Sequence, residues 1–323
     1  MDRVLEFVDS HISDRLSDLY YTYGGRLSWL TSVAGPGLQK QIASIFTNSN
    51  NVIRQGIELF LITWIMGTIM YLGTASFSYF TYFEREEAHR HPKFLKNQEW
   101  LEIKTALLNL PGMALLTFPW FLAEIHGYSQ CYDRLDEYGY TYLICSVVMF
   151  LLFSDFAIYW IHRALHHRLL YAPLHKLHHK WVIPTPFSSH AFNFLDGYAQ
   201  SLPYHIFPFL FPLNKYLYLF LFGFVNLWTV LIHDGEYLSN NAIVNGSAHH
   251  AVHHMYFNYN YGQFFTLFDR LGSSHRQPEA EMFDAKLRTN STVIRKQISI
   301  SDSIQKEVEG KDDRVYAHNG GEL

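Results

Sequence analysis

Histidine is the residue type whose number and spacing in this sequence most clearly indicate chemistry. The chain contains 19 histidines, and 13 of them lie between His162 and His254. Three clusters stand out, reading HRALHH from His162, HKLHH from His175 and HAVHH from His250. Because residues three or four apart share one face of a helix, the histidines of each cluster can point at a common centre.

The number of clustered imidazoles predicts a site for two metal ions. Zinc takes about four ligands, so eight or nine imidazoles exceed what one zinc ion can bind. Imidazole binds iron, zinc and copper, so the ligand type alone does not select the metal. A single histidine is usually an ordinary polar or core residue, but three spaced clusters favour a metal site. The candidate ligands are His162, His166, His167, His175, His178, His179, His250, His253 and His254.

Apolar segments long enough to cross a membrane must position these histidines. Ile57–Phe83, Ala106–Ala123 and Tyr142–Ile161 each come close to or exceed the ~20 residues that a spanning helix needs. Leu202–Leu213 is too short to cross alone and Tyr216–Ile232 is just long enough, so together they predict a helical hairpin. We therefore expect an all-α integral membrane protein with about three transmembrane helices plus the hairpin, roughly four spans.

The overall composition agrees with a membrane protein and excludes other classes. Hydrophobic residues make up 49% and aromatic residues 17% of the chain, which suits a wide lipid boundary. The net charge of -4 argues against nucleic acid as a partner. Only two cysteines occur and they form no CxxC pair, so a disulfide framework is not expected.

The distribution of basic residues predicts the orientation. Glu84–Lys104 contains five lysines and arginines, whereas the next connection, residues 124–140, contains only Arg134. The positive-inside rule places the first connection in the cytosol and the second in the lumen. All histidine clusters then lie together in a cytosolic cap, on the same side as the glycosylation sequons at Asn245 and Asn290, which we expect to be unmodified.

The sequence around the clusters resembles that of a known enzyme family. The strings are WVIPTPFSSHAFNFLDG (181–197), SLPYH (201–205), IHDGEYLSN (232–240) and HHMYFNYNYGQFFTLFDR (253–270). The spacing HxxxHH, HxxHH and HxxHH resembles the membrane fatty-acid hydroxylase/sterol desaturase superfamily. The strings resemble the sterol C-5 desaturases within it, most closely the fungal branch.

This resemblance implies an O2-dependent reaction that forms the C-5(6) double bond of a Δ7-sterol of the episterol type, in ergosterol biosynthesis at the endoplasmic reticulum membrane. It implies two non-haem irons held by the histidine boxes, and electrons from cytochrome b5 or an NADPH-dependent reductase. Since side chains cannot oxidise an unactivated C–H bond, a metal is expected to carry that chemistry. The sequence shows no haem-binding motif, so we expect a separate electron donor.

The resemblance also ranks the candidate ligands. By analogy with the related hydroxylases, His162 and His167 are placed above His166 in the first box. His233, in the IHDGEYLSN string, is predicted as an additional ligand from outside the boxes.

Three further residues are candidates for supporting roles. His190 can be a ligand or a neighbour of one, and His249, which precedes the third box, stays an uncertain candidate. Asp155 lies seven residues before His162 on roughly the same helix face. Because an acid within a span is functional by default, we predict that Asp155 accepts a hydrogen bond from a ligand histidine.

The expected organisation has three parts. Residues 1–53 form an N-terminal region with short helices and no cleavable signal. Residues 54–278 form the membrane-embedded fatty-acid hydroxylase/sterol desaturase domain. Residues 279–323 form a polar cytosolic tail, with an amphipathic helix over Val293–Val308 and a mobile end from Lys311.

Three alternative functions stay open on the sequence. A fatty-acid or sphingolipid hydroxylase would use the same boxes, and only the surrounding strings favour desaturation. A C-4 sterol methyl oxidase is disfavoured by the TPFSSHAF and IHDGEY strings. A histidine-rich zinc transporter would place its ligands near the middle of the membrane, whereas these boxes flank the spans.

Overall fold

The computed structural model describes residues 36–235, Tyr237 and 241–318, together with Leu5, Phe7, Val8, His11 and Arg15. The short helices expected within residues 1–53 can therefore be compared only from Pro36 on, where α4 spans Pro36–Thr47. Residues 319–323 lie outside the described residues. Within the described residues the fold is helical, and its two named strands are only two residues long.

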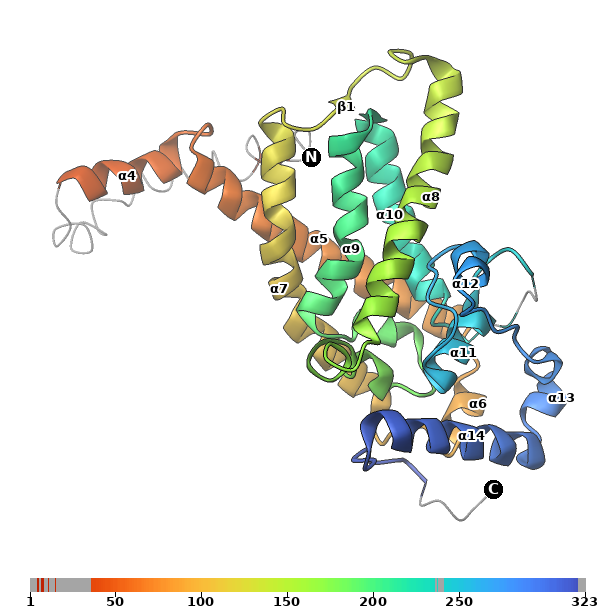
Figure 1. The fold of residues 1–323 in the computed structure, drawn as a ribbon. Helices are drawn as coiled ribbons and strands as arrows, with labels where there is room; N and C mark the ends of the chain where they lie inside the picture. The colour runs from red at the N-terminus through yellow and green to blue at the C-terminus, as the bar shows by residue number, and fades with distance from the viewer. Residues whose placement is uncertain are drawn as a thin grey trace.

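Five long helices form one bundle (Figure 1). They are α5 (Val52–Thr81), α7 (Gln98–Ile125), α8 (Gly139–Leu165), α9 (Phe194–Leu210) and α10 (Lys215–Leu231). The first three are long and apolar enough to cross a membrane, and α10 is a shorter apolar helix. Pro111 and Pro119 lie inside α7 without ending it. The predicted set of three spans plus a hairpin is confirmed.

The hairpin is fixed at its turn to the connection between α7 and α8. Strand β2 (Leu213–Asn214) joins α9 to α10 and pairs in parallel with β1 (Cys131–Tyr132). Asn214 caps α10 by accepting hydrogen bonds from the backbone of its first turn. The same side chain donates to the Tyr132 carbonyl at 3.3 Å. Both open ends of the hairpin consequently return to the end of the bundle where α8 ends.

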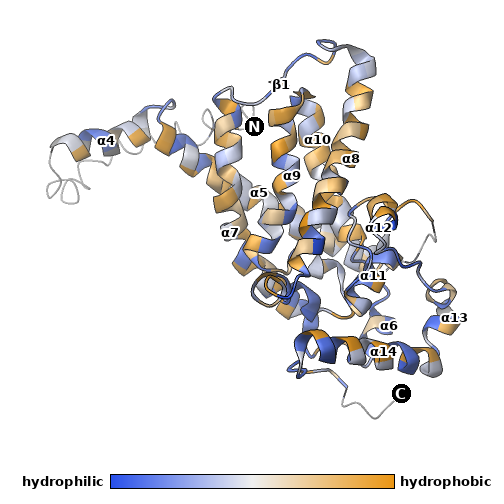
Figure 2. Ribbon diagram, in the orientation of Figure 1, coloured by the Kyte–Doolittle hydropathy of each residue, from blue (hydrophilic) through white to orange (hydrophobic). Residues whose placement is uncertain are grey.

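The long helices of the bundle are mostly hydrophobic (Figure 2), and they expose large apolar side chains over much of their length. Examples on α5, α7 and α8 are Ile65, Ile69, Phe77, Phe80, Leu108, Leu115, Ile144, Val148, Phe156 and Trp160. So extensive an apolar surface is unfavourable in water and favourable in lipid. The exposed faces of these helices therefore form the lipid boundary of an integral membrane protein.

A cap of short elements and the 19-residue helix α14 covers one end of the bundle (Figure 1). Its elements are α6 (Arg85–Arg90), η3 (Tyr171–His175), η4 (His178–Lys180), η5 (Pro186–His190), α11 (Ser247–Tyr256), α12 (Leu267–Leu271), η6 (Ala280–Phe283), α13 (Ala285–Arg288) and α14 (Ser291–Glu309). The expected amphipathic helix is α14, which ends at Gly310 with a positive φ of 80°. Beyond it, His318 Nε2 lies 2.7 Å from the carbonyl of His89 in α6. The C-terminal segment and the α5–α7 connection thus meet on one side.

This arrangement predicts the membrane topology. Tags within Glu84–Lys104 and at the C-terminus should be accessible from the same side, and a tag beside Tyr138 from the other, because α7 and α8 each cross the bundle. From the basic residues of the first connection, we expect the shared side to be cytosolic. Protease protection in sealed microsomes measures this. Opposite sides for the first two tags would contradict the common cap.

Candidate metal centre

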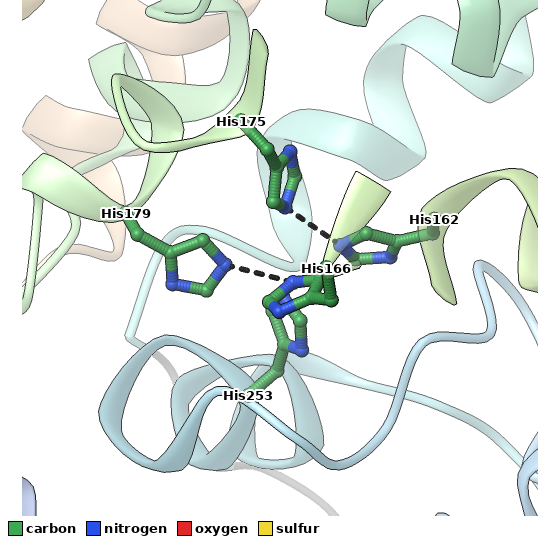
Figure 3. Close-up of side chains that lie close together, drawn as sticks. All are labelled: His162, His166, His175, His179 and His253. Atoms are coloured by element: carbon green, nitrogen blue, oxygen red, sulfur yellow. Dashed lines mark hydrogen bonds between the residues drawn. The ribbon is translucent and has the colours of Figure 1, made fainter. Parts of the chain in front are cut away.

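The structure brings nine histidines together in two groups. The first is His162, His166, His175, His179 and His253, and the second is His178, His233, His250 and His254. Within each group the candidate ligand atoms all lie within 4.8 Å of one another. Figure 3 shows the rings of the first group converging on one centre. The two groups provide the arrangement that two metal ions would require.

The groups are assembled from the ends of several elements. His162 lies in the last turn of α8, and His233 follows the end of α10. His175 ends the π-helical turn η3, while His178 begins η4. The third box lies on α11, where His250 and its partners are all buried. The ligands of each group therefore come from several different elements, which meet at the cap.

The first box is ordered differently from the prediction. His166 follows His162 by four residues, so both rings lie on the same helix face and enter the first group. His167 is one position farther round the helix, and it is exposed outside both groups. Its Nδ1 accepts a hydrogen bond from the backbone of Leu169 at 3.4 Å. The geometry therefore ranks His166 above His167, the reverse of the order inferred by analogy.

Four of the nine rings are oriented through Nδ1. The pairs are His162 with the Tyr261 carbonyl (3.0 Å), His253 with the Tyr259 carbonyl (2.7 Å), His233 with the Thr229 carbonyl (2.7 Å) and His175 with the Asp196 carboxylate (2.8 Å). Because these oxygens only accept, each Nδ1 carries a hydrogen and donates it. In a neutral ring with this tautomer, Nε2 is a free lone pair, as a metal ligand must be.

The spacing of the oriented rings suits a shared cation. Nε2 of His162 lies 3.1 Å from Nε2 of His175. Where both rings are neutral and carry their hydrogen on Nδ1, two lone pairs face each other at this distance, and a positive ion between them would remove their repulsion. Imidazole nitrogens bind a metal such as zinc at about 2.0–2.1 Å, so two neighbouring ligand atoms lie roughly 3 to 3.4 Å apart. The observed separation fits two adjacent ligands of one metal.

Burial keeps the remaining rings ready to bind a cation. Burial, reinforced by neighbouring imidazoles, holds the pKa well below its usual value for His166, His178, His179, His250 and His254. At neutral pH these rings are uncharged, so they need lose no proton before they coordinate a metal.

Asp155 does not contact a ligand histidine, so that prediction is corrected. Its Oδ1 accepts hydrogen bonds from the backbone of Gln263, Phe264 and Phe265 at 2.9, 2.7 and 3.3 Å. This carboxylate fixes the loop that follows the third box, because three backbone N–H donors converge on it. The same loop supplies the Tyr261 carbonyl that orients a histidine of the first box. Asp155 thus acts through the loop.

The carboxylate that contacts a ligand histidine is Asp196, which the sequence analysis missed. It lies in the first turn of α9, is fully buried, and receives Nδ1–H of His175. The two residues are 21 positions apart and in different elements, so no helical spacing connects them. The available signal was an acid within the string 181–197, where a buried aspartate after a capping Asn193 needs a partner.

The C-terminal segment closes over the second box. Arg314 donates to the carbonyls of His179 and Lys180 at 2.8 and 3.1 Å and pairs with Glu309 at 2.8 Å. The Arg314 and Glu309 side chains are only 3% and 1% exposed. Tyr171, whose ring packs on His166 and His179, donates to Glu309 at 2.6 Å. Residues 311–318 are thus held by specific contacts, unlike the mobile end expected from Lys311.

The remaining candidates lie outside both groups. His249 is fully buried, stacks on His275 at 5.7 Å between ring centroids, and belongs to neither group. His190 lines a cavity of about 310 Å³ inside the bundle. This cavity also reaches His162 of the first group and His233 of the second, so it connects both centres to the apolar interior.

Asp196→Asn should weaken metal retention by about 10- to 100-fold, because it removes the charged acceptor that orients His175. Metal bound per chain during titration with a chelator measures this. The exposed carboxylate of Asp136 is paired with Arg134 near the opposite end of the bundle, so Asp136→Asn is the matched control. Equal retention in both variants would show that Asp196 does not support the centre.

Comparison with known proteins assigns the chain to a family. The family model described as fatty acid hydroxylase matches residues 147–274, which include all three boxes. Delta(7)-sterol 5(6)-desaturase erg32 of Schizosaccharomyces pombe is 62% identical over 98% of each chain. Delta(7)-sterol 5(6)-desaturase erg31 of the same organism is 59% identical over 84% of this chain and 90% of its own length. A probable Delta(7)-sterol 5(6)-desaturase of Neurospora crassa is 53% identical over 86% of this chain and 80% of its own.

No solved structure matches the chain. The alignment with erg32, however, extends well beyond the histidine boxes and covers the residues of both the membrane helices and the cap. On this identity over nearly its whole length, the chain belongs to the fungal Delta(7)-sterol 5(6)-desaturase family.

Proposed function

We propose that this protein introduces the C-5(6) double bond into a Δ7-sterol, using O2 and two irons held by the nine grouped histidines. The observation that carries the proposal is the apolar cavity that reaches both histidine groups. A membrane-dissolved substrate can enter such a cavity from the bilayer, and the ring carbons to be oxidised can approach the metals there. The names of the relatives supply the position of the double bond.

Each part of the proposed site has a separate task. The histidines hold the two metals, and the carbonyls and the Asp196 carboxylate hold the rings. Bound iron would supply the oxidising power that amino-acid side chains lack. The cavity walls, including Leu110, Phe121 and Val225, exclude water and confine the sterol to one orientation. Orientation decides which two hydrogens are removed.

We also propose the cellular setting and the partners. The substrate class and the basic first connection support the endoplasmic reticulum membrane, with the cap facing the cytosol. Electrons would come from a separate cytochrome b5 or NADPH-dependent reductase at that face. We propose residues 54–278 as the membrane-embedded catalytic domain. Residues 279–318, which include α14 and Arg314, cover the second histidine box of this domain.

His178→Ala and His253→Ala should each abolish activity while membrane insertion and abundance stay nearly unchanged. Each substitution removes one imidazole from a different group, and the remaining ligands no longer hold both metals in position. Product formation and iron content should fall together from about two irons per chain. His275→Ala is the control, since that ring lies outside both groups and should be dispensable. Near wild-type turnover in both ligand variants would refute the dimetal proposal.

Expression in a host that lacks the activity should convert Δ7-sterols into 5,7-dienes. A conjugated diene absorbs in the near ultraviolet and the Δ7-monoene does not, so extracted sterols can be scored by absorbance and then identified by mass. The His178→Ala variant is the matched negative control and should form no diene. If hydroxylated fatty acids appeared and the diene did not, the fatty-acid hydroxylase alternative would replace the sterol assignment.

A further inference from the structure

The cavity contains a polar pair that the metal centre does not use. His190 ends η5, and Asn226 lies in α10; both line the cavity. His190 is 7% exposed and belongs to neither histidine group. Its Nδ1 lies 3.1 Å from Ser189 Oγ, and its Nε2 lies 3.4 Å from Asn226 Oδ1. The latter distance is long for a hydrogen bond, so the pair is only weakly satisfied internally.

The pair presents one donor and one acceptor to the cavity. Burial lowers the pKa of His190 to about 4, so its ring is neutral and carries a single hydrogen. The Ser189 hydroxyl can donate to Nδ1, which leaves that hydrogen on Nε2. Asn226 uses its Nδ2 to donate to the Phe222 carbonyl at 2.7 Å, which directs Oδ1 towards His190. A hydroxyl group can accept from Nε2–H and donate to Oδ1 at once.

The position of the pair suits the hydroxyl of a sterol. The ring of His190 packs on Phe192, which in turn packs on His178 of the second group, at centroid distances of 6.0 and 5.9 Å. The ring of Phe192 thus contacts both the pair and the metal centre. In a sterol, the hydroxylated carbon C-3 and C-5 belong to the same ring. When C-5 faces the metals, the hydroxyl must therefore lie close beside them.

A second buried imidazole in the cavity fits less well. His205 lies nine residues beyond Asp196 in α9, which is about 13 Å along the helix axis towards the far end of the bundle. Its Nδ1 is 3.3 Å from the Tyr218 hydroxyl. If the sterol hydroxyl were bound at His205, the metals would face the sterol's alkyl side chain or ring carbons far from C-5.

We propose that His190 and Asn226 bind the hydroxyl group of the sterol substrate and thereby select the ring carbons that face the metal centre. This inference rests on the proposed sterol desaturation. The apolar walls of the cavity hold the ring system without fixing its position along the cavity, because apolar contact is not directional. The hydroxyl contact supplies the one directional constraint.

The test compares a Δ7-sterol with its 3-deoxy analogue in the iron-loaded enzyme. The wild type should prefer the hydroxylated sterol. His190→Leu and Asn226→Leu should each lower kcat/KM for it by about tenfold to a hundredfold, the effect of losing one buried hydrogen bond, chiefly through KM. Turnover of the deoxy analogue should stay at the wild-type level. His190→Gln, which keeps an N–H donor, should recover part of the loss.

Two controls show whether the hydroxyl contact itself sets the preference. Thr63→Val removes a hydroxyl of the same cavity and should leave the preference for the hydroxylated sterol unchanged. Iron content should be equal in all variants. An unchanged preference in His190→Leu and Asn226→Leu would overturn the proposal, and so would loss of iron from His190→Leu, which would assign that ring to the metal centre. A wild type that converts neither sterol would instead refute the proposed function.

Discussion

Nine imidazoles directed at two centres, eight of them buried and one half-buried, form the constraint on which the rest of the structure depends. Removing so many polar rings from water is unfavourable unless their lone pairs are satisfied. The Nε2 atoms of His162 and His175 illustrate this, since they lie only 3.1 Å apart. A cation bound by both groups of rings would satisfy these lone pairs and would link α8, η3 and α11. The geometry of the cap is therefore that of a site able to hold metal ions.

Buried carboxylates meet this constraint in two ways. Asp196 contacts a ligand ring directly, whereas Asp155 and Asp269 hold the loop whose carbonyls orient other rings. Asp269 receives the backbone N–H groups of Tyr261 and Gly262, the residues next to those bound by Asp155. A side chain at Gly262 would overlap the Phe265 carbonyl, so the loop closes tightly only with glycine there. Rigid carbonyls, more than side chains, determine where the imidazoles point.

The sequence predicted what depends on local spacing. Long apolar runs identify α5, α7 and α8, and histidines four apart on a helix identify rings that share a face. It could not predict contacts between distant segments. The four-residue step from His162 favours His166, yet analogy placed His167 higher. Asp155 is close to His162 in sequence, but its hydrogen bonds go to residues more than 100 positions away. The fold, and not the spacing, decides such partners.

The covering of the second box by Arg314 has a consequence for how the enzyme is made. The carbonyls of His179 and Lys180 receive their guanidinium donors from a residue near the end of the chain. During synthesis the membrane helices and all three boxes leave the ribosome before this residue does. The boxes can therefore meet while the covering segment is still absent, and the side that it later closes is then open. A metal ion would have an interval for insertion there, which ends when the segment around Arg314 docks.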